Sequence, residues 1–453
     1  MSEVKLPQGW CNANLEDTVE ILDSVRVPVN NAERQSRIKG KPENKLYPYY
    51  GATGEVGKID DYLFDEELVA LGEDGVPFLD SDKKKAYMLY GKTWVNNHAH
   101  VLKEINGLSK NKYICYFLNQ FDYHNHVNGG TRLKLTQANM RKIPIYLAPF
   151  TEQTIIIKTL DALLAQVDSI KAHLEQIPLI IKKFRQSVLA AAVSGKLTED
   201  WRGVENPIHL RKLGELASDI RYGTSKKCSK EKGNTPVLRI PNIGMGHIIK
   251  DDLKYADFDH KELEGLSLKD GDLLLIRSNG SVELVGKVAV ISKDDEKFLF
   301  AGYLIRIRLD LEKSVPHYIS FCLQSPQIRQ TIENIARSTS GVNNINSKEL
   351  SSLELPIPSM SEQAEIVRRV EQLFAYADGV EKQVKNALER VNNLTQSILA
   401  KAFRGELTAQ WREENPELIS GENSAEALLA RIKAERAAQQ PQKKTHQKAS
   451  AAG

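Results

Sequence analysis

The sequence predicts two mixed α/β domains that alternate with two long α-helices in a tandem duplication. The first observation is an internal repeat, because residues 135–202 match residues 345–412 without a gap at an offset of 210. The second is an apolar stripe that runs in alternating steps of four and three along both matching segments. The third is a series of short β-type runs, closed by Gly, Asn and Asp turns, before each segment.

The composition is that of a soluble protein with more than one domain. At about 100 to 200 residues per domain, 453 residues suggest about two to four folded units. Apolar residues make up 41% and charged residues 27%, far from disordered or collagen-like compositions. Residues 1–10 lack the apolar core of a signal peptide, and no run of about eighteen apolar residues occurs, so we expect a cytoplasmic protein. The net charge of +3 is compatible with a polyanionic partner but does not identify one.

The cysteines suggest neither a metal site nor a disulfide framework. Cys11, Cys115, Cys228 and Cys322 lie about a hundred residues apart, and no C-x-x-C pair occurs. We therefore expect four free thiols.

The first globular domain is expected over residues 1–150, before a first helical spacer over residues 151–203. The duplication also reaches into this domain, because residues 67–75 align with residues 272–280 at an offset of 205. Residues 98–103 align with residues 303–308 at the same offset. The globular domains are therefore related to each other, although more distantly than the helices.

The first spacer should be one long helix with a coiled-coil seam. Its apolar positions are Ile156, Leu160, Leu163, Val167, Ile170, Leu174, Ile177, Ile181, Phe184 and Val188. About forty residues at about 1.5 Å per residue give a helix of roughly 60 Å. Pro178 interrupts this pattern and is expected to kink or split the helix.

The second half repeats this order. A globular domain is expected over residues 204–360, with strands near 288–291 and 303–308, and a second spacer helix over residues 361–412. The seam of this helix consists of Ile366, Val370, Leu373, Ala377, Val380, Val384, Ala387, Val391, Leu394 and Ile398. Residues 413–453 should hold a short helix and a disordered basic tail, because residues 437–453 have too few apolar side chains to pack.

Several segments carry a family resemblance. Pro149–Gln153 and Pro358–Gln363 each place a proline before a Glu-Gln pair at a helix start. Gln396–Trp411 and its counterpart Gln186–Trp201 end the two helices with closely related sequences. Further segments in the first domain are Tyr49–Gly54, Gly72–Gly75 and Trp94–His100. Over about residues 5–436 the chain thereby resembles the specificity subunits of type I restriction-modification enzymes.

The resemblance implies two target-recognition domains held apart by an antiparallel coiled-coil spacer, each reading one half of a split, asymmetric DNA site. It implies a non-catalytic subunit that binds double-stranded DNA, whose helices dock two methyltransferase subunits and direct adenine methylation and DNA restriction. Restriction and translocase subunits join in the full complex. S-adenosylmethionine, ATP and Mg are expected on the partner subunits and not on this chain.

DNA contacts are expected from polar side chains on exposed loops, because base edges and phosphates take directional donors and acceptors. In the first domain the expected DNA-binding residues are Tyr50, Thr53, Asn96, Asn97, His98, Thr131, Arg132 and Lys134. In the second domain they are Arg239, Asn242, Arg277, Ser278, Asn279, Arg337, Ser340 and Gly341. The alternative for each residue is that Asn and Gly only form turns and the hydroxyls only cap them.

The ends of both helices offer candidate partner contacts. Trp201 with Arg202, and Trp411 with Arg412, are expected to bind the methyltransferase subunits. The alternative is that each pair forms a cap tucked into the helix pair.

Other chemistries are not supported by the motifs. The run from Gly51 to Lys58 lacks the spacing and the Ser or Thr of a phosphate-binding loop. His98 and His100 have no further ligand at metal-binding spacing, and Asp80 with Asp82 is more typical of a solvated loop than of a nuclease. A self-contained methyltransferase-nuclease is therefore disfavoured. A coiled-coil scaffold or a regulatory DNA-binding protein without a role in modification remains the alternative.

Overall fold

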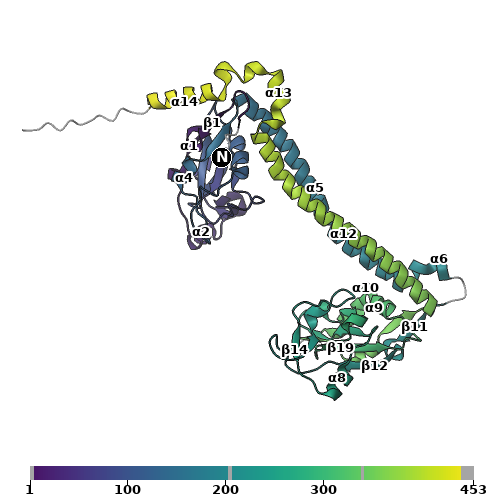
Figure 1. The fold of residues 1–453 in the computed structure, drawn as a ribbon. Coiled ribbons are helices and arrows are strands. Elements are labelled where there is room, and N and C mark those ends of the chain that lie inside the picture. Colours follow the sequence, from purple (N-terminus) through teal and green to yellow (C-terminus); the bar gives the residue numbers. More distant parts are fainter. Residues whose placement is uncertain (1–4, 203–206, 338–340, 440–453) are drawn as a thin grey trace, which may run out of the picture. The chain divides into compact units, whose positions relative to one another are not determined.

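The computed structural model describes residues 5–202, 207–337 and 341–439. The chain divides into two compact units, one formed by Met1–Glu175 with Asn386–Gly453 and the other by Gln176–Lys385. Each unit therefore contains one globular domain and parts of both long helices (Figure 1). Within the described residues no helix is both long enough and apolar enough to cross a membrane.

The first unit is built around a four-stranded antiparallel sheet in the order β2-β9-β6-β7. Its strands are β2 (Val19–Ile21), β9 (Ala99–Glu104), β6 (Leu68–Gly72) and β7 (Ala86–Leu89). All five residues of β6 are buried, which explains why this strand reads as a continuous apolar run. Helix α3 (Asn111–Gln120) supplies Tyr113, Ile114 and Phe117 to the same core.

Smaller elements complete the first unit. A second sheet has the order β4-β3-β8-β5, with strands Gly54–Ile59, Tyr47–Gly51, Lys92–Val95 and Phe64–Asp65. The run from Gly51 to Lys58 belongs to the β3–β4 hairpin of this sheet. A two-stranded ribbon joins β1 (Cys11–Asn14) to β10 (Pro144–Leu147), which leads directly into the first long helix.

The second unit repeats this arrangement. Its central antiparallel sheet has the order β12-β19-β15-β17, formed by Ala217–Tyr222, Leu304–Leu309, Leu273–Ile276 and Val288–Val290. Helix α9 (Pro316–Gln324) packs on it, and the ribbon of β11 (His209–Lys212) and β21 (Glu354–Ile357) leads into the second long helix. A three-stranded sheet has the order β14-β13-β18, with strands Lys254–Ala256, Thr235–Leu238 and Leu299–Phe300. The predicted duplication of a mixed α/β domain is confirmed.

Two long helices, α5 (Phe150–Val193) and α12 (Met360–Phe403), contribute to both units. In the first unit Ile156 from the start of α5 shares a core with Leu399 and Phe403 from the end of α12. In the second unit Val188 from the end of α5 shares a core with Ile366 from the start of α12. The helices therefore pack antiparallel within each unit (Figure 1).

Parts of two expectations about the helices are wrong. Pro178 does not split α5, which continues without a break from Phe150 to Val193, while a kink at Pro178 stays a prediction. Pro178 is exposed, so water can reach the carbonyl of Leu174 that loses its helical donor. Ile170 and Leu394 are not seam residues, because their side chains are 48% and 44% exposed. Two paired helices bury only a narrow stripe, and these positions fall outside it.

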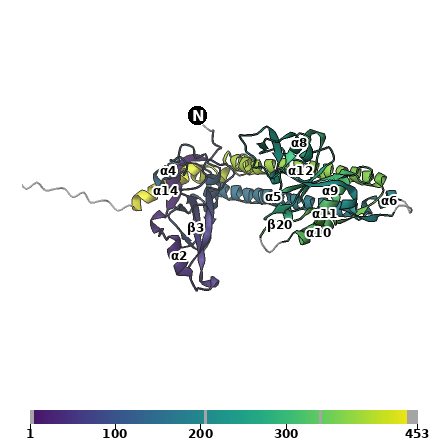
Figure 2. The ribbon, with the colours of Figure 1, turned by 90° about the horizontal axis from the view of Figure 1, so that it is seen from below.

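The C-terminal segment packs onto the first unit. Helix α14 (Ala425–Gln439) buries Leu428, Leu429 and Ile432 against a cluster that includes Ala13 and Leu147. It lies beside α1 (Leu15–Thr18) in Figure 1, and Lys433 pairs with Asp17 at 2.8 Å. Figure 2 shows α14 against the same unit, seen from below. The expected disordered tail, residues 440–453, lies outside the described residues. The four cysteines are free thiols, as predicted.

Candidate nucleic-acid interface

The loops at one end of the first unit's central sheet gather polar side chains from distant parts of the sequence. Gly72 at the end of β6 pairs with Ala99 at the start of β9, so the residues that follow one strand and precede the other meet at this end. Asp74 forms an isolated antiparallel bridge with Lys134, which brings the loop around residues 128–137 to the same place. We call this the first sheet-end site.

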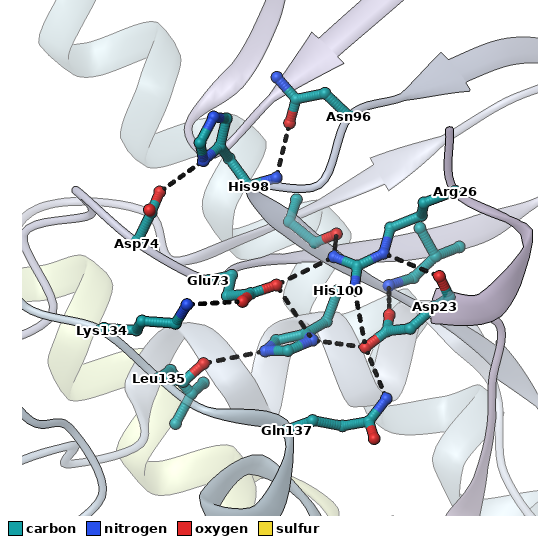
Figure 3. A network of polar contacts seen from close by, with 12 residues as sticks. Asp23, Arg26, Glu73, Asp74, Asn96, His98, His100, Lys134, Leu135 and Gln137 are labelled. Carbon is teal, nitrogen blue, oxygen red and sulfur yellow. Dashed lines mark hydrogen bonds and ion pairs between the residues drawn. The ribbon is translucent and has the colours of Figure 1, made fainter. Parts of the chain in front are cut away.

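Buried polar contacts hold the base of the first sheet-end site (Figure 3). The His100 side chain is 1% exposed, with Nδ1 2.7 Å from Oδ2 of Asp23 and Nε2 3.0 Å from the carbonyl oxygen of Leu135. Arg26 pairs with both Asp23 and Glu73, at 3.3 and 3.0 Å. Strand β9, the loop after β2 and the loop of Leu135 are thereby tied together.

Asp23 is the most connected carboxylate of this base. Burial by itself raises the pKa of Asp23, but the hydrogen bond and charge of His100 act in the opposite direction. The backbone N–H of Val101 and the side-chain amide of Gln137 also donate to this carboxylate, at 2.9 Å each. The pKa of Asp23 therefore lies below its ordinary value, so the carboxylate stays ionised at neutral pH.

Three basic side chains lie above this base and reach solvent. Nδ1 of His98 lies 2.8 Å from Asp74, Arg132 lies 3.1 Å from the same carboxylate, and Lys134 lies 3.2 Å from Glu73 (Figure 3 labels His98 and Lys134). Arg132 and Lys134 are 66% and 52% exposed, whereas Asp74 and Glu73 are 20% and 16% exposed. The carboxylates thus orient the cationic tips of Arg132 and Lys134, which remain available to phosphates or base edges.

The other predicted residues of the first domain lie on neighbouring loops. Asn96 accepts a hydrogen bond from the backbone N–H of His98 at 2.8 Å, and its own N–H donates to the carbonyl of Tyr50. The Tyr50 ring stacks on Tyr87 with centroids 5.6 Å apart. Thr53, Asn97 and Thr131 are exposed. The structure therefore brings the predicted set together, with Asn96 and Tyr50 shaping the loops that carry the exposed members.

The equivalent end of the second unit's sheet forms the second sheet-end site. Strand β16 (Ser278–Asn279) follows β15 and pairs antiparallel with β20 (Asn343–Asn344), in the place of the Asp74–Lys134 bridge. Arg277 precedes β16, and its backbone N–H donates to the carbonyl of Tyr303, just before β19. The two sites thus share a backbone frame, but Ser278 and Asn279 stand where the first site has Glu73 and Asp74.

The remaining predictions for the second domain separate into three groups. Arg277, Ser278 and Asn279 lie together in the second sheet-end site. Arg239 is bound to Asp252, and Asn242 is fully buried, donating to the carbonyls of Ile249 and Asp251. The expectation that Asn242 lies on an exposed loop is therefore wrong, because its amide closes the loop's own backbone hydrogen bonds. Arg337 and Gly341 are exposed, and Ser340 lies outside the described residues.

The sequence reasoning did not select several members of these sites. In the first site these are Asp23, Arg26, Glu73, Asp74 and His100, and in the second they are Tyr222, Tyr303 and Asn344. For two of these residues the alignments contain a signal. The offset of 205 places Tyr303 with His98, and the offset of 210 places Asn344 with Lys134. Only the fold shows that both alignments lead to one sheet end.

The arginines at the helix ends form internal contacts. Buried Glu152 in the first turn of α5 accepts from Arg412 at 2.5 Å and from Thr408 at 2.6 Å. Buried Glu362 in the first turn of α12 accepts from Arg202 at 2.8 Å and from Thr198 at 2.7 Å. Each copy of the helix-end sequence therefore caps the start of the other copy's helix.

The tryptophans beside these arginines are more accessible. Trp201 is 41% exposed and Trp411 is half-buried. The described geometry thus favours the cap for Arg202 and Arg412, while Trp201 and Trp411 stay predicted partner contacts.

These features define a duplicated protein with two recognition domains, which use one backbone frame to present different polar side chains. The chain belongs to the type I restriction-modification DNA specificity family. The model of this family, described as "Type I restriction modification DNA specificity domain", matches residues 7–179 and 207–390. The family resemblance found in the sequence is confirmed.

Curated relatives extend this match over nearly the whole chain. The EcoKI specificity subunit of Escherichia coli (strain K12) is 48% identical over 99% of this chain and 100% of its own length. The StySPI specificity subunit of Salmonella potsdam is 45% identical with the same coverage. Among solved structures, the HsdS subunit from Thermoanaerobacter tengcongensis is similar in fold, with a TM-score of 0.54 and 16% identity over 89% of this chain and 99% of that one. A chain from a type I R-M system covers 88% of this chain and 99% of its own length, with a TM-score of 0.63 and 17% identity.

Proposed function

We propose that each globular domain reads one part of a split, asymmetric DNA sequence through its sheet-end site. The observation that carries this proposal is the shared frame with different side chains. Cations held by Asp74 and Glu73 line the first site, whereas Arg277, Ser278, Asn279 and Asn344 line the second. Because base-edge recognition depends on donors and acceptors, two such sites select different base pairs.

Membership of the family supports the rest of the proposed assembly. The chain works beside modification and restriction subunits of a type I system in the cytoplasm, and two methyltransferase subunits dock on the duplicated helices. The two equivalent helix ends, with Trp201 and Trp411, offer one docking site for each of the two methyltransferase subunits. S-adenosylmethionine, ATP and Mg belong to these partners, which supply adenine methylation and DNA cleavage.

The test is to co-express the chain with its modification subunit and to map methylated adenines in the host genome by single-molecule sequencing. A split motif with a constant spacer is expected. Replacing residues 207–344 with the equivalent segment of a relative should then change one part of the motif and leave the other intact. A change in both parts would contradict separate reading, and an unmethylated genome despite a stable complex would favour a scaffold.

A further inference from the structure

The second sheet-end site contains an arginine whose environment differs from that of its neighbours. Six of the seven arginines in residues 207–336 lie within 4.0 Å of an Asp or Glu carboxylate: Arg211, Arg221, Arg239, Arg306, Arg308 and Arg329. Arg277 makes no ion pair with any residue that the structure describes. Its charge is therefore not neutralised within the described part of this unit.

Arg277 is nevertheless held in a defined orientation. Its guanidinium carbon lies 4.5 Å from the centroid of the Tyr222 ring, and its Nε donates to Oδ1 of Asn344 at 3.2 Å. Its backbone N–H donates to Tyr303, and its carbonyl accepts from Ile345, both at 2.9 Å. Apart from the stacking and the hydrogen bond at Nε, the two terminal Nη nitrogens have no hydrogen-bond partner among the described residues.

Tyr222 is fixed in turn by its hydroxyl group. The backbone N–H of Ser347 donates to this oxygen at 2.8 Å, and the hydroxyl lies 3.2 Å from Oγ of Ser347. Ser347 begins α11 (Ser347–Ser351), whose N-cap Asn346 accepts from Lys348 and Glu349. The ring under Arg277 is thus anchored to a capped helix, so the guanidinium reaches its position without ordering a flexible loop.

The surrounding side chains suit a base edge better than a phosphate. Ser278, Asn279 and Asn344 are uncharged, directional groups, and the exposed Tyr303 adds an aromatic surface. Lysine is concentrated in the exposed segment Lys226–Lys232, which follows β12 and contains four lysines. Phosphates accept such flexible point charges, whereas the planar fork of arginine matches O6 and N7 of guanine.

We infer that Arg277 reads a guanine in the major groove through its two Nη nitrogens, with Tyr222 and Asn344 as the residues that position it. This inference rests on the proposed function, because it assigns the base class recognised at the second sheet-end site. It predicts a G·C pair in the part of the target read by residues 207–344.

The experiment compares methylation motifs of complexes that contain wild-type chain, Arg277→Ala or Arg277→Lys with the same modification subunit. Both variants should relax one guanine position to other bases and leave the other part of the motif unchanged. Lysine keeps the charge but not the fork, so its failure to restore guanine separates base reading from simple attraction. Lys227→Ala removes an exposed cation outside the Arg277 cluster and should leave the whole motif unchanged.

Binding of purified complexes to duplexes provides a second readout if a variant no longer methylates. Replacing the guanine should weaken wild-type binding roughly 5- to 100-fold and Arg277→Ala binding by less than about 3-fold. Asn344→Ala, which keeps Arg277, should give an intermediate ratio between binding to the guanine duplex and binding to the substituted duplex. Equal weakening of every duplex by Arg277→Ala would identify a phosphate contact and overturn the inference, as would an unchanged motif. Absence of any motif with the wild-type chain would instead contradict the proposed function.

Discussion

Nη1 of Arg412 lies 2.5 Å from Oε1 of Glu152, although 260 residues separate them along the chain. The corresponding pair in the second unit, Arg202 and Glu362, is joined at 2.8 Å through Nε. The two carboxylates also differ at their second oxygen. Trp10 donates to Oε2 of Glu152 at 2.9 Å, whereas Oε2 of Glu362 has no donor among the described residues. Ile208 stands before β11 where Trp10 stands before β1, which explains the missing donor.

The buried carboxylates should contribute unequally to stability. Glu152→Ala removes the acceptor of hydrogen bonds from Arg412, Thr408 and Trp10. It should lower the unfolding free energy by about 3 to 5 kcal/mol, because it breaks a buried ion pair. Glu362→Ala removes one hydrogen bond fewer and should cost about 1 kcal/mol less. Urea denaturation measures both values, with Glu381→Ala, the loss of an exposed pair, as a control worth less than about 1 kcal/mol. Equal losses for all three variants would refute the capping role.

Pro178→Ala should stabilise the paired helices. The substitution restores a backbone N–H to α5 at an exposed position without changing a packed side chain, so we expect a gain of about 1 to 3 kcal/mol in unfolding free energy. Thermal denaturation with circular dichroism at 222 nm measures the change. A lower melting temperature would show that the local geometry at Pro178 is needed by the helix.

Leu373→Pro should have the opposite effect. Leu373 packs against the second unit's core in the interior of α12, so proline removes a helical hydrogen bond and disturbs this packing. We expect loss of assembly with the modification subunit in size-exclusion chromatography, more severe than for any single loop substitution. Leu373→Ala is the matched control, because it shortens the side chain but keeps the helix. Normal assembly of the proline variant would contradict the view that the paired helices α5 and α12 are needed for assembly with the modification subunit.

The stabilising effect of Asp23 should depend on pH. Because the folded-state pKa of Asp23 is lowered, its contribution is present above the unfolded pKa of about 3.9 and is lost as the pH falls through the lower folded value. Asp23→Asn should therefore be less stable than wild type at pH 7, and the difference in unfolding free energy should shrink below about pH 4. Denaturation curves at pH 7, 5 and 3 test this, and a difference independent of pH would contradict the ionic contribution.

Packing of α14 should stabilise the first unit. Leu429→Asp places a charge among Ala13, Leu108 and Leu147, so we expect a loss of about 2 to 4 kcal/mol. Arg431→Asp, on the exposed face of the same helix, should cost less than about 1 kcal/mol. Hydrogen exchange of β1 and β10 provides the local readout. Unaltered protection in Leu429→Asp would mean that the helix does not stabilise this ribbon.

The sequence alone determined the elements whose signal is periodic or repeated. The gapless match of residues 135–202 with 345–412 predicted two equivalent helices, and the buried positions Ile156, Val188 and Ile366 follow the expected seam. The runs of apolar residues near 288–291 and 303–308 predicted strands, and the structure forms β17 and β19 there. These features depend on neighbours along the chain, so a pattern in the sequence is enough to find them.

Only the tertiary structure decided which polar residues act together. Asp23, His100 and Leu135 come from three segments that meet because β2, β9 and the loop around residue 134 converge at one sheet end. Arg277 is distinguished from Arg239 by what lies within 4 Å, a carboxylate for Arg239 and an amide for Arg277, and no spacing in the sequence encodes that difference. Hydrogen bonds and ion pairs act over a few ångströms in space, whereas the groups that form them here lie 13 to 77 residues apart in the chain.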